Sequence, residues 1–200
     1  MGTDPGRLRG LRPDERGVAL ALERVTGSTA RAHDVDGRQG AVDLVLLHPD
    51  GRTAAVEVTS LAADGVRRRG TEAGPGRQRW PDPRRPWWTV EGATSSVAAT
   101  LDDLPAALSA LLEVASVARR ADKVAGVRDV DERHLVVELG EGALPRRLYA
   151  ALCTPGTPVP TADPVVPDGL THLWLTTGWG GSPLLGWQRG AGWSAYPAPA

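Results

Sequence analysis

The sequence predicts an α/β domain followed by a tryptophan-rich extension that contains β-structure. Two segments, 13–26 and 101–120, space their apolar residues at helical intervals. Between them, residues 39–60 form two apolar stretches around Pro-Asp-Gly, which is typical of two strands joined by a turn. We therefore divide the chain into three parts: a disordered arm (1–12), an α/β core (13–140) and a C-terminal extension packed on that core (141–200).

The first helix is expected over residues 13–26. Pro13 is favoured at a first helical position, and the acids Asp14 and Glu15 interact well with the positive end of the helix dipole. Gly27 is a suitable residue to end the helix. Its buried stripe is expected to be Val18, Leu22 and Val25.

Three strands are expected to follow, over 29–37, 40–48 and 52–60. Residues 61–85 are rich in Gly, Pro and Arg and show no periodicity, so they predict a long loop. Residues 86–92 predict a short strand.

Helices and strands continue to alternate in the second half of the chain. A helix over 101–120 is indicated by leucines at helical spacing, with Pro105 tolerated in its first turn. The later elements are expected to be a strand (133–140), a short helix (143–153), a proline-rich connector (154–169), a strand (170–179) and a hairpin (183–197).

One acid lies in the middle of each strand of the 39–60 hairpin. Asp43 interrupts the run AVDLVLL, and Glu57 interrupts the run AAVEVTS. Strand side chains alternate between faces, and the two positions are equidistant from the turn, so both carboxylates are expected on one face. They would repel each other unless a proton or a cation lay between them. The alternative is that both acids simply face solvent on a half-exposed hairpin.

Paired carboxylates are ligands that Mg²⁺ and Mn²⁺ accept together with water and substrate phosphate. An ion held in this way polarises a phosphodiester and generates hydroxide. The pattern therefore predicts Asp43 and Glu57 as ligands of Mg²⁺ or Mn²⁺.

A helix with Glu23, a strand, a strand with Asp43 and a strand with Glu57-Val58-Thr59 resemble the PD-(D/E)XK, or restriction-endonuclease-like, nuclease superfamily. The resemblance implies an α-β-β-β-α-β core with an acid on the second strand, acid–any–lysine on the third, and a helix glutamate. Members cut DNA or RNA with a divalent metal, and others have lost cleavage. The C-terminal segments also resemble uncharacterised actinobacterial proteins, and this implies no function.

The chain departs from that signature at Thr59, where active members have a lysine that orients or activates the attacking water. Some members carry the basic residue on a neighbouring helix, and Lys123, one lysine among 22 arginines, stands just past the expected second helix. The alternatives are an ordinary exposed residue for Glu23 and an end-of-helix lysine for Lys123. The resemblance implies these catalytic candidates: Glu23, Asp43, Glu57, Thr59 and Lys123.

The long loop after the third strand carries two groups of arginines that could bind phosphates. Three tryptophans in and just after it could stack on unpaired bases, while solvated arginines and loop-anchoring tryptophans are the alternatives. The candidate nucleic-acid contacts are Arg67, Arg68, Arg69, Arg84 and Arg85, with Trp80, Trp87 and Trp88 as stacking candidates.

Composition excludes several other classes of protein. The net charge of −1 gives no sign of the overall positive potential that is typical of nucleic-acid-binding proteins. No apolar run approaches the roughly 20 residues of a membrane span. The polar N-terminus lacks the apolar core of a signal peptide. The single Cys153 excludes a disulfide framework and a cysteine-rich zinc site. We therefore expect a cytoplasmic protein without membrane contact.

Two functions stay open at this point. The first is a metal-dependent nuclease that acts on or binds DNA or RNA. The second is a catalytically inactive nuclease-fold scaffold that works through a protein partner. Thr59 and the near-neutral charge favour the second, because tight phosphate binding usually needs a clustered basic surface.

Overall fold

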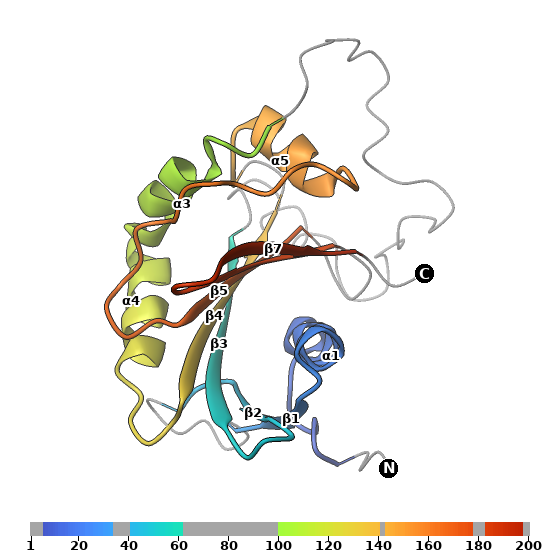
Figure 1. Ribbon diagram of the computed structural model, residues 1–200. Coiled ribbons are helices and arrows are strands. Elements are labelled where there is room, and N and C mark those ends of the chain that lie inside the picture. The colour runs from blue at the N-terminus through green and yellow to red at the C-terminus, as the bar shows by residue number, and fades with distance from the viewer. Residues whose placement is uncertain (1–5, 34–40, 62–99, 141–142, 178–182, 198–200) are drawn as a thin grey trace, which may run out of the picture.

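A computed structural model describes residues 6–33, 41–61, 100–140, 143–177 and 183–197. Within these ranges the chain is a mixed α/β protein in which helices lie on both faces of one seven-stranded sheet (Figure 1). The described helices are α1 (Pro13–Thr26), α3 (Leu104–Leu112), α4 (Ala115–Ala125) and α5 (Arg146–Cys153).

The strands follow one another in the sheet in the same order as in the chain. Those in the middle, β3 to β4 and β4 to β5, pair in parallel, whereas all other neighbours pair antiparallel. The parallel pairs need crossovers, which contain α3 and α4 in the first case and α5 in the second. The strands are β1 (Thr29–Ala32), β2 (Leu44–Leu47), β3 (Thr53–Leu61), β4 (Glu132–Leu139), β5 (His172–Thr176), β6 (Leu184–Gln188) and β7 (Gly192–Tyr196).

The first helix begins and ends as its residues predict. Pro13 occupies the first turn, and the Glu15 carboxylate accepts the backbone N–H of Arg12 at 2.9 Å. Gly27 ends the helix in the left-handed conformation, with φ of 67°.

The segment before α1 differs from the expected disordered arm. Over residues 6–12 the chain forms a turn, and Leu8 and Leu11 are buried in the core beneath α1. Arg7 forms an ion pair with Glu23 of the helix. The two buried leucines and this ion pair attach the segment to the domain.

The predicted turn between β2 and β3 is confirmed. Gly51 has φ of 89°, and the His48 N–H donates to Arg52 O at 2.9 Å across the turn. Glycine adopts this left-handed conformation without the steric cost of a β-carbon.

The single helix expected over 101–120 is instead two helices, and this prediction is corrected. Val114 has an extended backbone with ψ of 122° and separates α3 from α4. Within each helix the buried residues recur at helical spacing. In one continuous helix, however, the five-residue step from Leu112 to Val117 would place the second stripe about 140° around the helix axis from the first. A continuous helix could not bury both stripes, which consist of Leu104, Leu108 and Leu112 in α3 and Val117, Ala121 and Val124 in α4.

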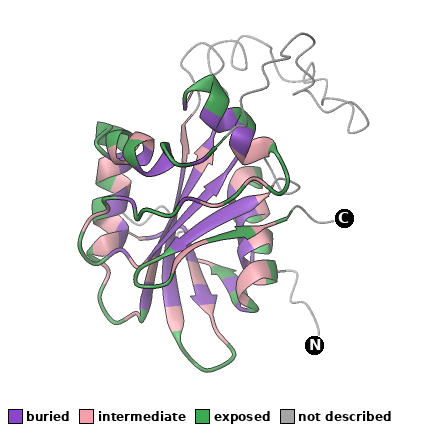
Figure 2. Cartoon of the chain, turned by 45° about the horizontal axis from the view of Figure 1, so that its top comes forward, coloured by how far each residue is buried: buried purple, intermediate pink, exposed green. Residues whose placement is uncertain are grey.

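Two apolar cores lie on the two faces of the sheet, and the strands β3 to β6 in its middle are the most buried (Figure 2). Neighbouring strand residues alternate between these cores, as strand geometry requires. The face covered by α3, α4 and α5 includes Ala55, Leu135 and Leu173. The face covered by α1 includes Val56, Val136 and Trp174.

The C-terminal segment continues the same sheet through β5, β6 and β7. Two of its tryptophans fasten the proline-rich connector that precedes it. The indole N–H of Trp187 donates to Asp163 Oδ1 and that of Trp193 donates to Ala162 O, both at 2.8 Å. The strand expected over 86–92 lies outside the described residues.

Candidate functional site

The register of β2 and β3 brings the two strand acids together. Leu44 pairs with Val56, so Asp43 and Glu57 occupy the next positions along the two strands. Asp43 precedes β2 directly, and its Oδ2 accepts the backbone N–H of Val58 at 2.8 Å. This side chain thereby supplies the hydrogen bond that β2 no longer offers to β3 at this point.

Both acids are removed from solvent. The Glu57 side chain is 0% exposed, and that of Asp43 is 11% exposed. The alternative of two solvent-facing acids is therefore wrong. Buried carboxylates need compensating charge or hydrogen bonds, because desolvation of an ion is expensive.

The compensating charge comes from α4, which lies against β3. Lys123 Nζ lies 2.8 Å from Glu57 Oε2 and 3.1 Å from Oε1. Arg120, one turn earlier in the helix, contacts Glu57 Oε1 and has Nη1 3.8 Å from Asp43 Oδ2. Two carboxylates thus face two cations, and one guanidinium nitrogen approaches both acids.

Burial raises the pKa of Asp43 to about 6. The Val58 N–H opposes this shift, while the charges of Glu57 and Glu15 add to it and Arg120 opposes it. A carboxyl group that titrates near neutrality can exchange protons under physiological conditions, which is a property of acid–base sites.

Lys123 was expected just past the end of a helix, but it lies within the last turn of α4. Its ammonium reaches the second acid from the neighbouring helix, while Thr59, two residues beyond Glu57 on β3, is buried and uncharged. Lys123 therefore does more than interact with the dipole at the end of its helix, because it also pairs with the buried Glu57.

Glu23 is engaged in a different contact. Its Oε1 accepts the Ala30 N–H at 2.7 Å, and its Oε2 accepts Arg7 Nη2 at 2.9 Å. The α1 acid whose charge acts on Asp43 is Glu15, which is buried and held by Arg12 Nε at 2.7 Å. Glu15 lies in the first turn of α1, whereas Glu23 lies near its end.

The five loop arginines, Arg67, Arg68, Arg69, Arg84 and Arg85, and the three loop tryptophans lie outside the described residues. Their role in binding nucleic acid stays a prediction.

Sequence reasoning missed Arg120 and a histidine cluster on the other face of the sheet. Arg120 is i, i+3 to Lys123 and flanks the apolar stripe of α4, a signal that the mistaken single helix concealed. The cluster contains Glu132 and His134, whose spacing of two on a strand could have indicated a shared face.

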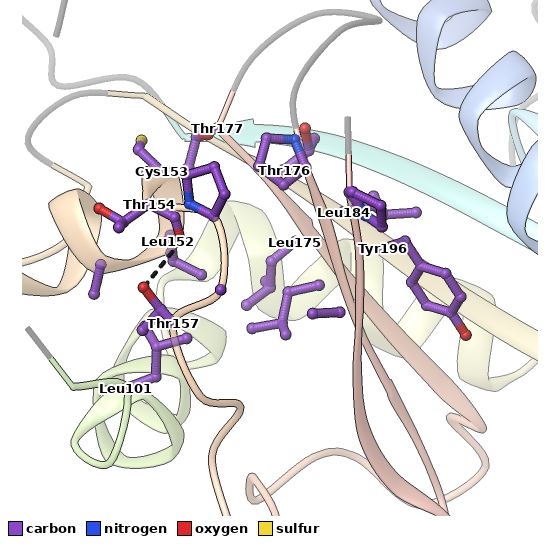
Figure 3. A pocket seen from close by; sticks show the side chains of 17 residues that line it. Leu101, Leu152, Cys153, Thr154, Thr157, Leu175, Thr176, Thr177, Leu184 and Tyr196 are labelled. Atoms are coloured by element: carbon purple, nitrogen blue, oxygen red, sulfur yellow. Dashed lines mark hydrogen bonds between the residues drawn. The ribbon is translucent and has the colours of Figure 1, made fainter. Parts of the chain in front are cut away.

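A cavity of about 670 Å³ lies where α5 meets β5, β6 and β7 (Figure 3). Its lining includes Leu101, Cys153, Leu175 and Tyr196, and no charged side chain among the described residues lines it. Burial raises the pKa of the Cys153 thiol, which favours its protonated form. This cavity is separate from the two strand acids.

Comparison of the chain with protein-family models, curated proteins and solved structures found no match. Among the described helices, none combines the length and apolar character needed to cross a membrane.

Proposed function

We propose that the chain is a metal-dependent phosphodiesterase that acts on nucleic acid, with Asp43 and Glu57 as ligands of Mg²⁺ or Mn²⁺. The observation that carries this proposal is the approach of Lys123 Nζ to within 2.8 Å of Glu57 Oε2. An ammonium group from α4 thereby stands in for the lysine that the family signature has at Thr59.

The order of the elements supports the same proposal. Helix α1, the antiparallel strands β1 to β3, the helices α3 and α4, and the parallel strand β4 follow the α-β-β-β-α-β order of restriction-endonuclease-like proteins. The second acid lies within the third strand, as in that family, whereas the first acid stands directly before the second strand rather than within it.

Each side chain has a distinct role in this proposal. Asp43 and Glu57 would hold the ion, and Mg²⁺ or Mn²⁺ bound there would supply a Lewis acid for the phosphodiester. Lys123 orients the attacking water. Arg120, 40% exposed, can exchange its carboxylate contacts for a substrate phosphate, which guanidinium binds well.

A second candidate function is a non-catalytic scaffold that works through a protein partner. The contacts of Arg120 with both acids favour it, because Arg120 and Lys123 together already balance the two carboxylates without a metal. In this reading the site is a buried ion network that stabilises the contact between α4 and β3.

The test begins with calorimetric titration of Mn²⁺ into the wild-type chain and into Glu57→Gln. The nuclease proposal predicts binding that disappears in the variant, while Arg119→Gln, at an exposed position of the same helix, binds as wild type does.

Cleavage of single- and double-stranded DNA and RNA is then measured with Mn²⁺ and with excess chelator. Lys123→Met is expected to abolish cleavage while Mn²⁺ binding persists. A wild-type chain that neither binds Mn²⁺ nor cleaves any of these substrates would support the scaffold and exclude the nuclease.

A further inference from the structure

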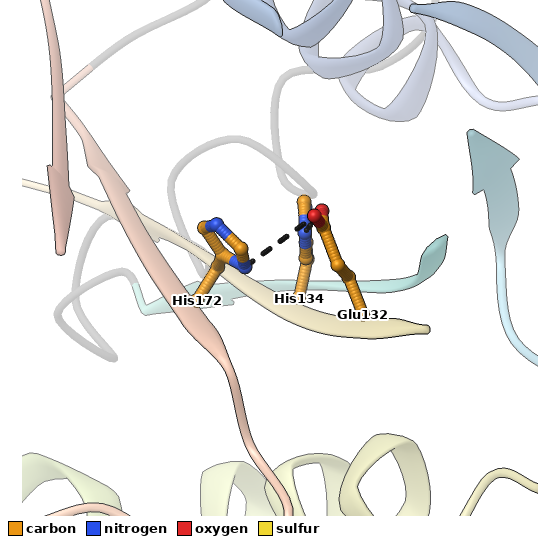
Figure 4. A group of neighbouring side chains, drawn as sticks. All are labelled: Glu132, His134 and His172. Carbon is orange, nitrogen blue, oxygen red and sulfur yellow. Dashed lines mark hydrogen bonds and ion pairs between the residues drawn. The ribbon is translucent and has the colours of Figure 1, made fainter. Parts of the chain in front are cut away.

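A second cluster of titratable side chains lies on the α1 face of the sheet, at the beginning of β4 and β5 (Figure 4). Glu132 and His134 are two residues apart on β4 and share a face, and His172 is the register partner of His134 on β5. One ligand atom from each of the three lies within 4.8 Å of the others.

Three imidazole nitrogens converge on a single oxygen, Oε2 of Glu132. His134 Nε2 lies 2.9 Å from it, His48 Nε2 lies 3.3 Å from it and His172 Nδ1 lies 4.0 Å from it. Three of the four histidines in the chain are thus gathered at one carboxylate. First-row divalent ions hold such ligands at about 2.0–2.2 Å, which separates neighbouring ligands by about 3–3.5 Å. His134 Nε2 and His48 Nε2 already lie at this spacing from Oε2, whereas His172 Nδ1, which also contacts Thr171 Oγ1 at 3.0 Å, has to move closer to hold an ion.

His48 supplies an independent indication that something is bound here. Its side chain is 7% exposed, and its buried Nε2 forms no hydrogen bond with any part of the chain that the structure describes. Buried polar nitrogens are nearly always satisfied. A cation placed beside Glu132 would give this nitrogen a partner in the tautomer that carries its proton on Nδ1.

The charge states of these groups suit ligation, and the proton that His134 carries on Nε2 has to leave that atom when an ion binds. Burial lowers the pKa of His134, and it lowers the pKa of His172 to about 3, so both imidazoles are neutral at pH 7. The hydrogen bond from His134 lowers the pKa of Glu132 to about 2, which keeps the carboxylate ionised. Arg52 binds the other carboxylate oxygen and orients the group, as outer-shell partners do in metal sites.

We propose that Glu132, His134 and His172, with His48 as a fourth donor, bind one divalent transition-metal ion of the zinc class. Imidazole donors with one carboxylate favour Zn²⁺ and neighbouring first-row ions, whereas the oxygen-only pair Asp43 and Glu57 favours Mg²⁺ or Mn²⁺. The site lies on the opposite face of the sheet, and the proposal does not depend on the proposed function.

Trp174 gives this site a specific spectroscopic readout. Its indole N–H donates to His134 Nδ1 at 3.3 Å, and indole is a donor only, so the proton of neutral His134 is on Nε2. Coordination through Nε2 moves that proton to Nδ1 and leaves the Trp174 N–H without its acceptor. Metal binding is therefore expected to change the fluorescence of Trp174.

The test uses the purified full chain after treatment with a chelator. Zn²⁺ affinity is measured by competition with a chromophoric chelator for wild type, Glu132→Gln and His172→Gln. The wild type is expected to bind one Zn²⁺, and each ligand variant is expected to bind at least about tenfold more weakly. His33→Gln, at the exposed fourth histidine, is expected to bind as wild type does.

Absence of stoichiometric Zn²⁺ binding in the wild type, or an affinity in both ligand variants equal to that of the wild type, would overturn the proposal. If a ligand variant loses its native circular dichroism spectrum, X-ray absorption of the zinc-loaded wild type decides. Imidazole scattering supports the site, and an oxygen-only shell overturns it. The Zn²⁺-induced fluorescence change should disappear in Trp174→Phe. If it persists in full, the inferred movement of the His134 proton from Nε2 to Nδ1 is wrong.

Discussion

Replacing Lys123 with methionine tests whether the charge on α4 is coupled to the buried acid of β3. Methionine keeps most of the length of the side chain and removes its charge. Glu57 is 0% exposed, so its carboxylate cannot recover the lost contact from water. Arg120 remains against Oε1 and continues to balance part of the charge.

The magnitude follows from these contacts. Removing one partner of a buried ion pair costs about 3–5 kcal/mol. Because Arg120 stays in place and the Lys123 side chain is 25% exposed, we expect a smaller loss, about 2–3 kcal/mol in the free energy of unfolding. For a chain of this size each kcal/mol lowers Tm by about 2–4 °C, so Tm should fall by about 4–12 °C.

The assay is urea unfolding at pH 7.5, followed by circular dichroism, for Lys123→Met, Glu57→Gln and the double variant. Once Glu57 is uncharged, the lysine has no buried anion to balance. We therefore expect Lys123→Met to cost less than about 1 kcal/mol in the Glu57→Gln background, a coupling typical of residues in contact.

Arg119→Met is the matched control, because Arg119 is an exposed residue of the same helix and should change stability by no more than about 0.5 kcal/mol. Equal costs for Lys123→Met and Arg119→Met, or the same Lys123→Met cost in both backgrounds, would refute the proposed coupling.

Three further predictions concern pH and packing. Burial holds the pKa of His172 at about 3 and that of His134 below its usual value. As the pH falls, the unfolded chain therefore binds protons on these two residues at a higher pH than the folded chain does. The free energy of unfolding measured in urea should therefore fall below about pH 6.5, by up to about 1.4 kcal/mol per pH unit for each group. The pKa of Asp43 at about 6 predicts that calorimetric Mn²⁺ affinity falls about tenfold per pH unit below that value, and a flat profile from pH 7 to 5 would contradict this ligand assignment. Gly186→Ala places a β-carbon 2.7 Å from Trp174 Cε3, so it should lower stability by about 1–3 kcal/mol, and an unchanged Tm would show that the ring can move aside.

Much of the local structure was predictable because short segments encode it. Pro13, the acids after it and Gly27 define α1, and the Pro-Asp-Gly turn at Gly51 sets the register of β2 and β3. That register depends only on residues near the turn, so it also predicted that Asp43 and Glu57 would be neighbours.

What the sequence could not determine is which distant side chains meet these elements. Glu57 and Lys123 are far apart in the chain, and their contact depends on the break at Val114, which rotates α4 so that its own stripe faces the sheet. The acid expected to support the site, Glu23, instead binds Arg7 of the N-terminal segment and the Ala30 N–H of β1.

The histidine cluster illustrates the same division. Spacing alone puts Glu132 and His134 on one face of a strand, because strand side chains repeat every two residues. Only the tertiary structure, through the parallel pairing of β4 with β5 and the turn that carries His48, gathers the other imidazoles around that carboxylate. Periodicity is a property of a few consecutive residues, whereas convergence at a site depends on how whole elements pack.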